Sequence, residues 1–430
     1  MSVLRISAFA ACLAASPLAA KPLVTSSEET VARICLAREV MPARIVEACD
    51  AALSDAGLTL SQRVELITAR GDGFLWNDRD EEAAASYREA ISIDPNAVDA
   101  WNGLGWALWE TEGDAAALEA FDASMSIEVS VQGLGGQAAV GRHAGRIDNE
   151  QARDMLRAAL TIDPDYSWAI REIAWSHLDD NDPEDAISRF NAALELDDHD
   201  RNARYGLGRS QLAAGDADAA LATFNDLLFD HPDDTSTRVY RIITLRRLDR
   251  NAQALRDSER LIADQPDVSS GYIEKGLSLI ALQRRGEAIA TYEEAERKIG
   301  ASNALLYWHA DALTIDGRFQ EALEIIDRGL ALPKADYSDH LMKSYIALEL
   351  KDYDLARQAA EDSLDTGVED PWAHYYIAIS LLHSGDIEGG MARFSQAMET
   401  GLPEDRVGDF ARELISAGKY VEAAQLRLTY

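Results

Sequence analysis

The sequence predicts an all-α protein built from a repeated helical hairpin. Small residues recur every 34 positions along most of the chain, with a single step of 35. Glycines and Asp-Pro pairs separate the segments, as expected where one helix ends and the next begins. No stretch shows the sustained polar–apolar alternation that indicates a β-strand. An array of this kind buries its apolar surface by stacking each hairpin on the next.

The period is clearest in a column of alanines. Four positions after each alanine an aromatic ring often recurs, as Phe121 follows Ala117, and twelve positions before it stands a small residue such as Gly105. We expect the small residues to let two helices approach closely and the ring to fill the space between hairpins. The column consists of Ala83, Ala117, Ala152, Ala186, Ala220, Ala254, Ala288, Ala322 and Ala356.

The segment Trp101-Asn102-Gly103-Leu104-Gly105, followed by Ala117 and Phe121, resembles the signature of the tetratricopeptide-repeat (TPR) family. The chain resembles exported bacterial members of this family. The resemblance implies a right-handed α-solenoid with a concave groove. It covers residues 64–404 as ten repeats. The expected organisation is a signal peptide at 1–20, a helical hairpin within 21–63, the repeats at 64–404 and a truncated capping repeat at 405–430.

The N-terminal segment is typical of a cleaved signal peptide. Arg5 precedes the apolar stretch 6–15, and small residues surround a cleavage point after Ala20. The apolar stretch is too short for a membrane-spanning helix. Residues 1–20 therefore predict a periplasmic or secreted protein without a membrane span after cleavage. An uncleaved anchor and lipid attachment at Cys12 are the alternatives.

Cleavage would leave two cysteines, Cys35 and Cys49. They lie on opposite sides of the turn at Met41 and Pro42, between the predicted helices 28–40 and 42–53. In an antiparallel hairpin these positions face each other, so we predict a disulfide in an oxidising compartment. Two separate buried thiols are the alternative.

The net charge is strongly negative. The chain has 75 acidic and 41 basic residues and a formal charge of -34. Such a surface repels phosphate backbones, so nucleic acid is not an expected partner.

Two short motifs imitate known sites. Residues 133–138 match a dinucleotide-binding fingerprint but lack the preceding strand, so we expect a weak, glycine-rich repeat helix instead. Residues 179–185 resemble a calcium loop but lack its glycine, and Asp182 is better explained as the cap of a helix that begins at Pro183. With no metal-ligand spacing among the histidines, we predict no catalytic residue, cofactor or metal.

The resemblance also implies where a partner binds. In TPR repeats, partner-facing residues occupy the second, fifth, ninth and twelfth positions of the first helix, and Trp, Tyr and Arg dominate binding hot spots. Later repeats add Tyr307, Tyr345, Trp372 and Tyr375. Packing of the rings against neighbouring helices is the alternative, expected for about half of them. The predicted groove residues are Asn102, Trp106, Trp109, Trp168, Arg171, Trp175, Tyr205 and Arg209.

These observations favour an extracytoplasmic scaffold or adaptor that binds a protein or peptide in the groove. An accessory subunit of an envelope machine, for polysaccharide export or cytochrome maturation, is the first alternative. An unrecognised hydrolase or transferase is the second.

Overall fold

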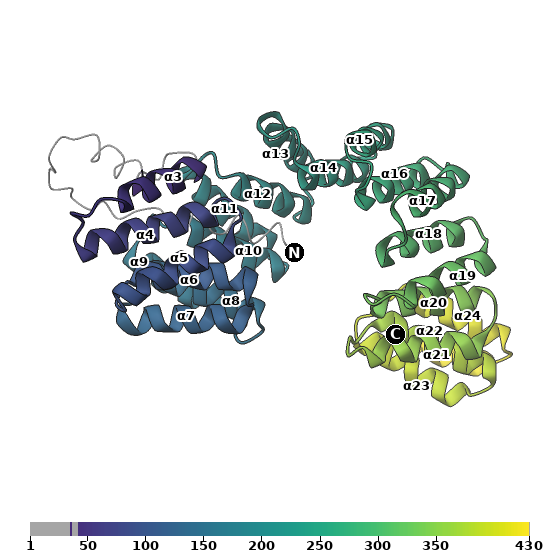
Figure 1. Cartoon of the computed structure of the whole chain (residues 1–430). Coiled ribbons are helices and arrows are strands. Elements are labelled where there is room, and N and C mark those ends of the chain that lie inside the picture. Colours follow the sequence, from purple (N-terminus) through teal and green to yellow (C-terminus); the bar gives the residue numbers. More distant parts are fainter. Residues whose placement is uncertain (1–34, 37–41, 430) are drawn as a thin grey trace. The chain divides into compact units, whose positions relative to one another are not determined.

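The computed structural model describes residues 35–36 and 42–429. This part of the chain forms the helices α3 to α25 and contains no strand, which confirms the predicted all-α fold (Figure 1). None of the helices in these residues is long and apolar enough to span a bilayer. The helices form two compact units that meet in sequence at Pro232 and Asp233. The predicted signal peptide at 1–20 lies outside the described residues.

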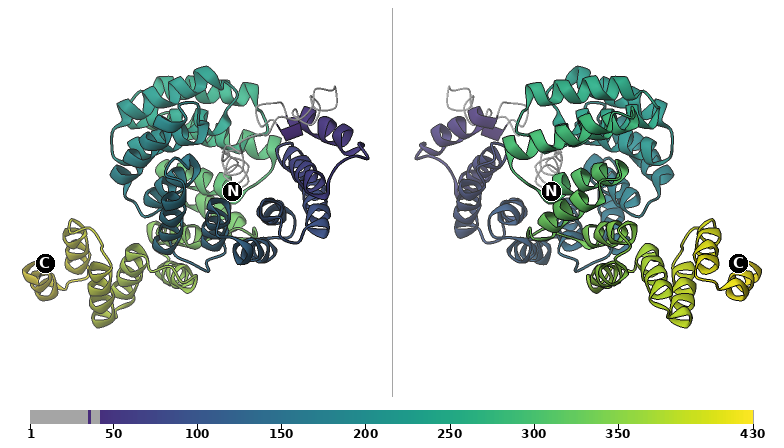
Figure 2. Two further views of the ribbon diagram at one scale, coloured as in Figure 1. Left: turned by 90° about the vertical axis from the view of Figure 1, so that its left-hand side faces the viewer. Right: turned by 90° about the vertical axis from the view of Figure 1, so that its right-hand side faces the viewer.

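In unit 1, consecutive helices contact each other along the chain, as Figures 1 and 2 show. Its helices are α3 (Pro42–Leu53), α4 (Leu60–Leu75), α5 (Asp80–Ile93), α6 (Val98–Thr111), α7 (Asp114–Ile127), α8 (Val131–His143), α9 (Asn149–Ile162), α10 (Ser167–Asp179), α11 (Pro183–Leu196), α12 (Arg201–Ala213) and α13 (Ala217–Asp230).

Unit 2 continues the same pattern of paired helices. Its helices are α14 (Thr235–Arg247), α15 (Asn251–Asp264), α16 (Ser269–Ala281), α17 (Arg285–Ile299), α18 (Asn303–Ile315), α19 (Phe319–Leu330), α20 (Tyr337–Glu349), α21 (Tyr353–Asp365), α22 (Pro371–Ser384), α23 (Ile387–Glu399), α24 (Arg406–Ser416) and α25 (Tyr420–Thr429). First helices also contact the next first helix, as α18 contacts α20 and α20 contacts α22.

The repeated small residues and rings pack as the sequence predicts. The fully buried ring of Phe121 on α7 lies against Gly105 of its own hairpin and Gly136 of the next. A Cβ atom at Gly105 would lie 2.7 Å from that ring, and one at Gly136 would lie 2.2 Å from it. Since real Cβ atoms do not approach so closely, glycine is needed where the helices of successive hairpins meet around a ring.

The glycine-rich segment of the third repeat forms the helix α8. Its first turn is capped by Ser130, whose hydroxyl accepts a hydrogen bond from the Gly133 amide at 3.1 Å. Gly135 leaves room for the Trp168 ring, to which a Cβ atom would come within 2.6 Å. The glycines thus have a packing role that the expectation of a loose helix did not include.

Glycine ends some first helices as predicted, but not all of them. Gly113 and Gly317 have φ values of 90° and 79°, in the left-handed region that glycine adopts without strain. Gly286 does not end a helix, although the sequence predicts that glycines separate the helices. Gln283 takes the positive φ, 60°, and Gly286 lies inside α17.

The N-terminal cysteines lie together. The Cα atoms of Cys35 and Cys49 are 4.8 Å apart, and their sulfur atoms are at bonding distance. Cys49 lies on α3, while most of the predicted helix 28–40 falls outside the described residues. The geometry therefore permits the predicted disulfide.

Candidate protein-binding site

The groove residues predicted in unit 1 are mostly buried. Tyr205 and Arg209 are partly exposed, whereas the others are inaccessible to a partner. In the free chain the buried members of the predicted set are Asn102, Trp106, Trp109, Trp168, Arg171 and Trp175, so their side chains do not line an open groove.

The tryptophans are buried because they pack on one another across successive hairpins. The centre of the Trp106 ring lies 5.3 Å from that of Phe121, in an edge-to-face contact, and 5.8 Å from that of Trp168 on α10. Trp109 lies 5.6 Å from Trp106 and donates its indole hydrogen bond to Asp114 at 2.7 Å. Edge-to-face pairs of this kind stabilise a core beyond the area that they bury. These rings belong to the core of unit 1.

Asn102 and Arg171 are occupied by internal partners. The side-chain amide of Asn102 donates a hydrogen bond to the hydroxyl of Ser130, the residue that caps α8, at 3.2 Å. The Arg171 side chain is 2% exposed and donates to the Asp200 carboxylate at 2.6 Å. Asp200 also caps α12 by accepting from two of its backbone amides. Arg171 therefore ties α10 to the start of α12 and does not present its charge to a ligand.

Burial also affects the neighbouring acid. Glu172 lies 3.7 Å from Arg171 and 3.9 Å from Arg142. Burial raises the pKa of its carboxyl group, and the two arginines only partly oppose this effect.

At the end of the same row, Arg209 lies over two rings. Its guanidinium group is 5.2 Å from the Trp175 ring and 5.9 Å from Tyr205, at cation–π distance. Trp175 itself packs edge-to-face on Phe190 at 5.0 Å. Only the outer members of this stack, Tyr205 and Arg209, reach the surface of unit 1.

In unit 2, the first helices present a different surface, which we call the α18–α22 face. Its rings are Tyr307 on α18, Tyr345 on α20, and Trp372 and Tyr376 on α22, and its acid is Asp311 on α18. Tyr345 is 37% exposed and stacks on Tyr376 at 6.1 Å with an interplanar angle of 28°. Trp372 lies 6.1 Å from Tyr376. Partly exposed aromatic rings therefore extend along three successive first helices.

Part of this face was selected by the rule that partner-facing residues occupy the second, fifth, ninth and twelfth positions of a first helix. It selected Tyr307, Tyr345 and Trp372, which are accessible, but also Tyr375, which is 7% exposed and packs near Phe394. It missed Tyr376, which follows the selected residue directly. The rule also covers Asp311, the ninth residue of α18, which the preference for hot-spot residue types does not select.

The α18–α22 face is acidic around Tyr307 and Tyr345, whereas at Trp372 the Arg406 guanidinium lies 5.2 Å from the centre of the ring. Burial raises the pKa of Asp311 to about 6. Burial, followed by the nearby Asp311 carboxylate, raises the pKa of Tyr307, and burial followed by Glu349 raises that of Tyr345. The tyrosines are thus neutral hydroxyl-bearing rings at physiological pH, set beside carboxylates.

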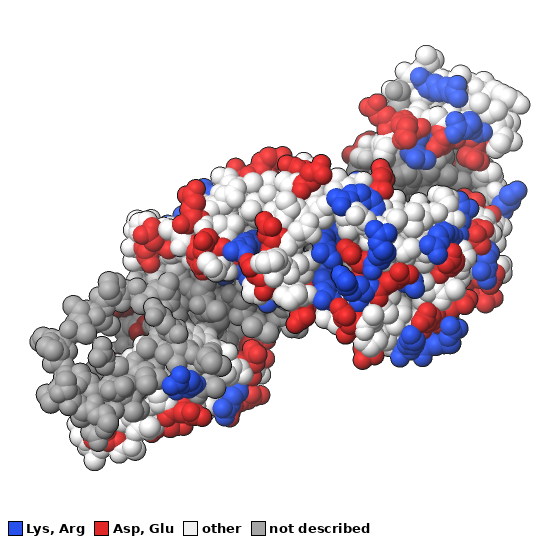
Figure 3. Space-filling model, turned by 90° about the horizontal axis from the view of Figure 1, so that it is seen from above, with Lys and Arg blue, Asp and Glu red and all other residues white. Residues whose placement is uncertain are grey.

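Arginines elsewhere in unit 2 are largely paired. Arg238 contacts Asp264 at 2.8 Å, and Arg246 contacts Glu274 at 2.9 Å. On the face drawn in Figure 3, Lys and Arg side chains lie among Asp and Glu and form no extended basic surface.

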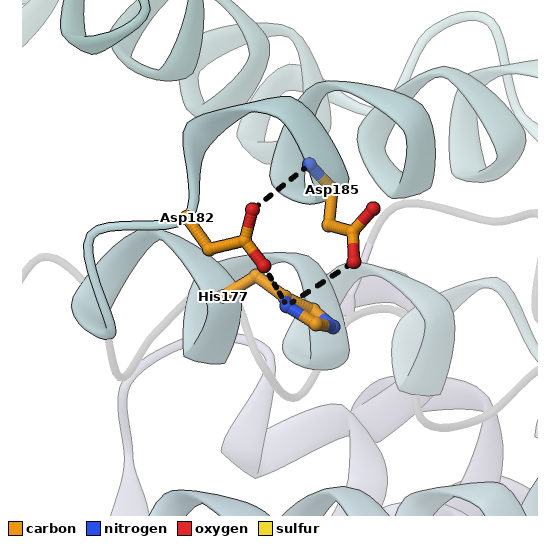
Figure 4. Close-up of side chains that lie close together, drawn as sticks. All are labelled: His177, Asp182 and Asp185. Carbon is orange, nitrogen blue, oxygen red and sulfur yellow. Dashed lines mark hydrogen bonds and ion pairs between the residues drawn. The ribbon is translucent and has the colours of Figure 1, made fainter.

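The segment that imitates a calcium loop is a helix cap. Asp182 accepts from the Asp185 amide at the start of α11, and its other oxygen lies 3.1 Å from Nδ1 of His177 (Figure 4). The Asp185 carboxylate lies 4.0 Å from the same nitrogen. The predicted role of Asp182 as the cap of α11 is confirmed, with the Asp185 amide as the capped group.

Comparison with known families identifies the class of protein. Two tetratricopeptide-repeat models match residues 177–242 and 273–337, and a TPR model matches residues 77–111. The matched residues lie in both units. Together with the helices α3 to α25, they establish the fold as an all-α TPR solenoid.

Individual relatives are distant. A 109-residue stretch is 28% identical to Superkiller protein 3 of Saccharomyces cerevisiae, and it covers 25% of this chain and only 7% of that protein. The crystal structure of yeast Tom70 shares 13% identity over 94% of this chain and 96% of its own, with a TM-score of 0.52. A tetratricopeptide-repeat protein from Parabacteroides merdae shares 18% identity over 59% of this chain and 99% of its own, with a TM-score of 0.44. Likeness at these identities shows the fold alone.

Proposed function

We propose that the chain is a non-catalytic scaffold that binds a protein or peptide through the α18–α22 face. The TPR fold is compatible with protein–protein interaction, and repeats of this kind typically bind protein partners. The observation that carries the proposal is the exposed Tyr345 ring, stacked on Tyr376 within a row of accessible aromatics. Tyr and Trp supply large, rigid contact area and dominate the energetics of interfaces.

Site-specific photo-crosslinking tests the proposal. A photoreactive phenylalanine analogue would replace Tyr345 in the organism that makes the chain, and the adducts would be identified by mass spectrometry. Tyr420 on α25 is the matched control, because it is also a tyrosine and is 67% exposed but lies outside the α18–α22 face. We expect a discrete protein adduct at position 345 and none at 420.

Alanine variants give the quantitative arm once the adduct is identified. Tyr345→Ala should weaken binding of the crosslinked partner by about thirtyfold, the effect of losing a typical hot spot. Tyr420→Ala should leave the affinity unchanged. Equal adducts at both positions, or unchanged affinity of Tyr345→Ala, would contradict the proposed site.

We further propose that the scaffold acts outside the cytoplasm, in a periplasmic or secreted location, with Cys35 and Cys49 oxidised. The composition of residues 1–20 and the adjacency of the two cysteines support this location. A thiol assay on the denatured, unreduced mature chain should detect no free thiol. Detection of two thiols per chain would refute the oxidised pair.

A further inference from the structure

Asp311 is an acid without a counter-charge. It lies in the middle of α18, partly buried, and has no hydrogen-bond or ion-pair partner among the residues that the structure describes. Removing a carboxylate from water is costly unless a cation or hydrogen-bond donors replace the water. The free protein therefore leaves a favourable interaction unmade at this position.

Two other acids in unit 2 that are largely buried have basic partners. The buried Glu274 carboxylate contacts Arg246 at 2.9 Å. Glu296 contacts His309 at 2.7 Å and Arg328 at 2.6 Å. Asp311 differs from these two acids because it has no basic partner among the described residues.

In unit 1, burial also raises the pKa of one acid, Asp80, to about 6, but its setting differs. Asp80 is the first residue of α5, where the unpaired backbone amides of the helix start favour a negative charge. Asp311, nine residues into its helix, has no such support.

Two tyrosines occupy positions near Asp311 on the α18–α22 face. Tyr307 precedes Asp311 by four residues and so shares its side of α18. Tyr345 belongs to α20, the next first helix, which contacts α18. Asp311 and Tyr345 occupy the same position, the ninth, of these two neighbouring helices. Glu349, one turn after Tyr345, adds a second negative charge.

We propose that Asp311, Tyr307 and Tyr345 form a receptor for an arginine side chain of an extended peptide segment, an inference that rests on the proposed binding role of the α18–α22 face. A guanidinium group pairs with a carboxylate through two parallel hydrogen bonds and stacks on tyrosine faces. It would supply the positive charge that Asp311 lacks. The net charge of -34 would also attract a basic segment at long range.

Calorimetric titration with defined peptides tests this receptor. The probes are a glycine peptide that carries two arginines and the same peptide with citrulline, a neutral residue of the same shape. Titrations are run at about 0.15 M salt, so that attraction by distant charges is screened. The unchanged chain should bind the arginine peptide at least about tenfold more tightly than the citrulline peptide, as expected for a charge-assisted pair.

Two variants separate the site from net charge. Asp311→Asn should reduce affinity for the arginine peptide about tenfold or more, while its melting temperature does not fall, because an uncompensated charge is removed. Asp354→Asn makes the same change of charge at a side chain that is 89% exposed on α21. It should leave the affinity within about twofold, as expected for an exposed charge.

A third variant tests the aromatic ring. Tyr307→Leu, which keeps an apolar side chain but removes the aromatic face, should weaken binding of the arginine peptide several-fold.

Each other outcome overturns the inference. Equal binding of both peptides, no binding of the arginine peptide, or equal losses in Asp311→Asn and Asp354→Asn would each show that no arginine receptor exists here. If a specific adduct still forms at position 345, the binding face stands and only the chemistry of its partner is wrong. If neither the adduct nor arginine binding is found, the proposed function fails with it.

Discussion

The ninth position of the first helix has opposite roles in α6 and α10 of unit 1 and in α18 and α20 of unit 2. In unit 1 it holds Trp106 on α6 and Trp175 on α10, and both rings are buried against rings of their own and neighbouring hairpins. In unit 2 it holds Asp311 on α18 and Tyr345 on α20, which are accessible. The same position of the repeat therefore serves the core in α6 and α10 and a surface in α18 and α20.

The difference arises from what lies opposite each ring. On α8, Gly135 and Gly136 provide the space that Trp168 and Phe121 fill. The glycine-rich third repeat and the tryptophan-rich repeats beside it are thus complementary parts of one packing arrangement. In unit 2, Tyr345 stacks on the partly exposed Tyr376, so its ring remains near the surface.

Charged side chains of the two units also differ in whether they have a partner within the chain. Arg171 in unit 1 is buried and paired with Asp200, whereas Asp311 in unit 2 lies without a partner among the described residues. A buried pair fixes two helices relative to each other, while an unpaired group is available to a ligand.

The largest expected effect comes from breaking the buried pair. Asp200→Asn keeps a side chain that can cap α12 but removes the charge that compensates Arg171. Because Arg171 would remain buried without its closest counter-charge, and Glu172 lies farther away at 3.7 Å, the free energy of unfolding should fall by about 3 kcal/mol.

Urea denaturation of Asp354→Asn provides the comparison. Asp354 contacts Arg357 at 3.7 Å in an exposed pair, so its loss should cost less than about 0.5 kcal/mol. Similar effects of the two substitutions would show that Arg171 finds another partner, and the contrast between buried and exposed charges would then be lost.

A smaller effect tests whether the glycines of α8 serve packing. Helix propensity alone predicts that Gly136→Ala stabilises the chain by up to about 1 kcal/mol. The clash with Phe121 at 2.2 Å predicts the opposite, a loss of about 2 kcal/mol, as in overpacked cores. Thermal or urea unfolding of the variant measures the sign directly.

Gly286→Ala is the matched control in unit 2. Gly286 also lies in a helix, and a Cβ atom there would meet nothing within 4 Å. This substitution should be neutral or stabilise the chain by less than about 1 kcal/mol. If Gly136→Ala also stabilised the chain, α8 would be the loosely packed helix that the sequence first suggested.

The sequence predicted the hairpins and their buried columns because these depend on local spacing. Ala117, Gly105 and Phe121 lie where the 34-residue period places them. It failed for Trp168 and Arg171 because their burial depends on α8 and α12, whose complementary glycines and Asp200 are separate in sequence. The period marks which side of a helix a residue occupies, but the neighbouring hairpin decides whether that side is covered.

The smallest effect concerns the pH dependence of Asp311. Its pKa is about 6 in the folded chain, above the ordinary value of 3.8, because burial disfavours the charged form. Between about pH 4 and pH 6 the folded chain therefore holds a proton that the unfolded chain has released. Stability from this group falls as pH rises through that window, and the cost persists above pH 6.

The difference in unfolding free energy between Asp311→Asn and the unchanged chain isolates this effect. The variant should gain little at pH 4 and about 1 kcal/mol above pH 6, after discounting the partial exposure of the carboxylate. Tyr292, Tyr307 and Tyr345 face Asp311 but stay neutral throughout, and burial raises the pKa of Tyr292 further. Glu274, whose pKa burial also raises, titrates in both proteins and cancels in the difference. A difference that did not change with pH, or that favoured the unchanged chain above pH 6, would mean that a counter-charge already compensates Asp311 in the free protein.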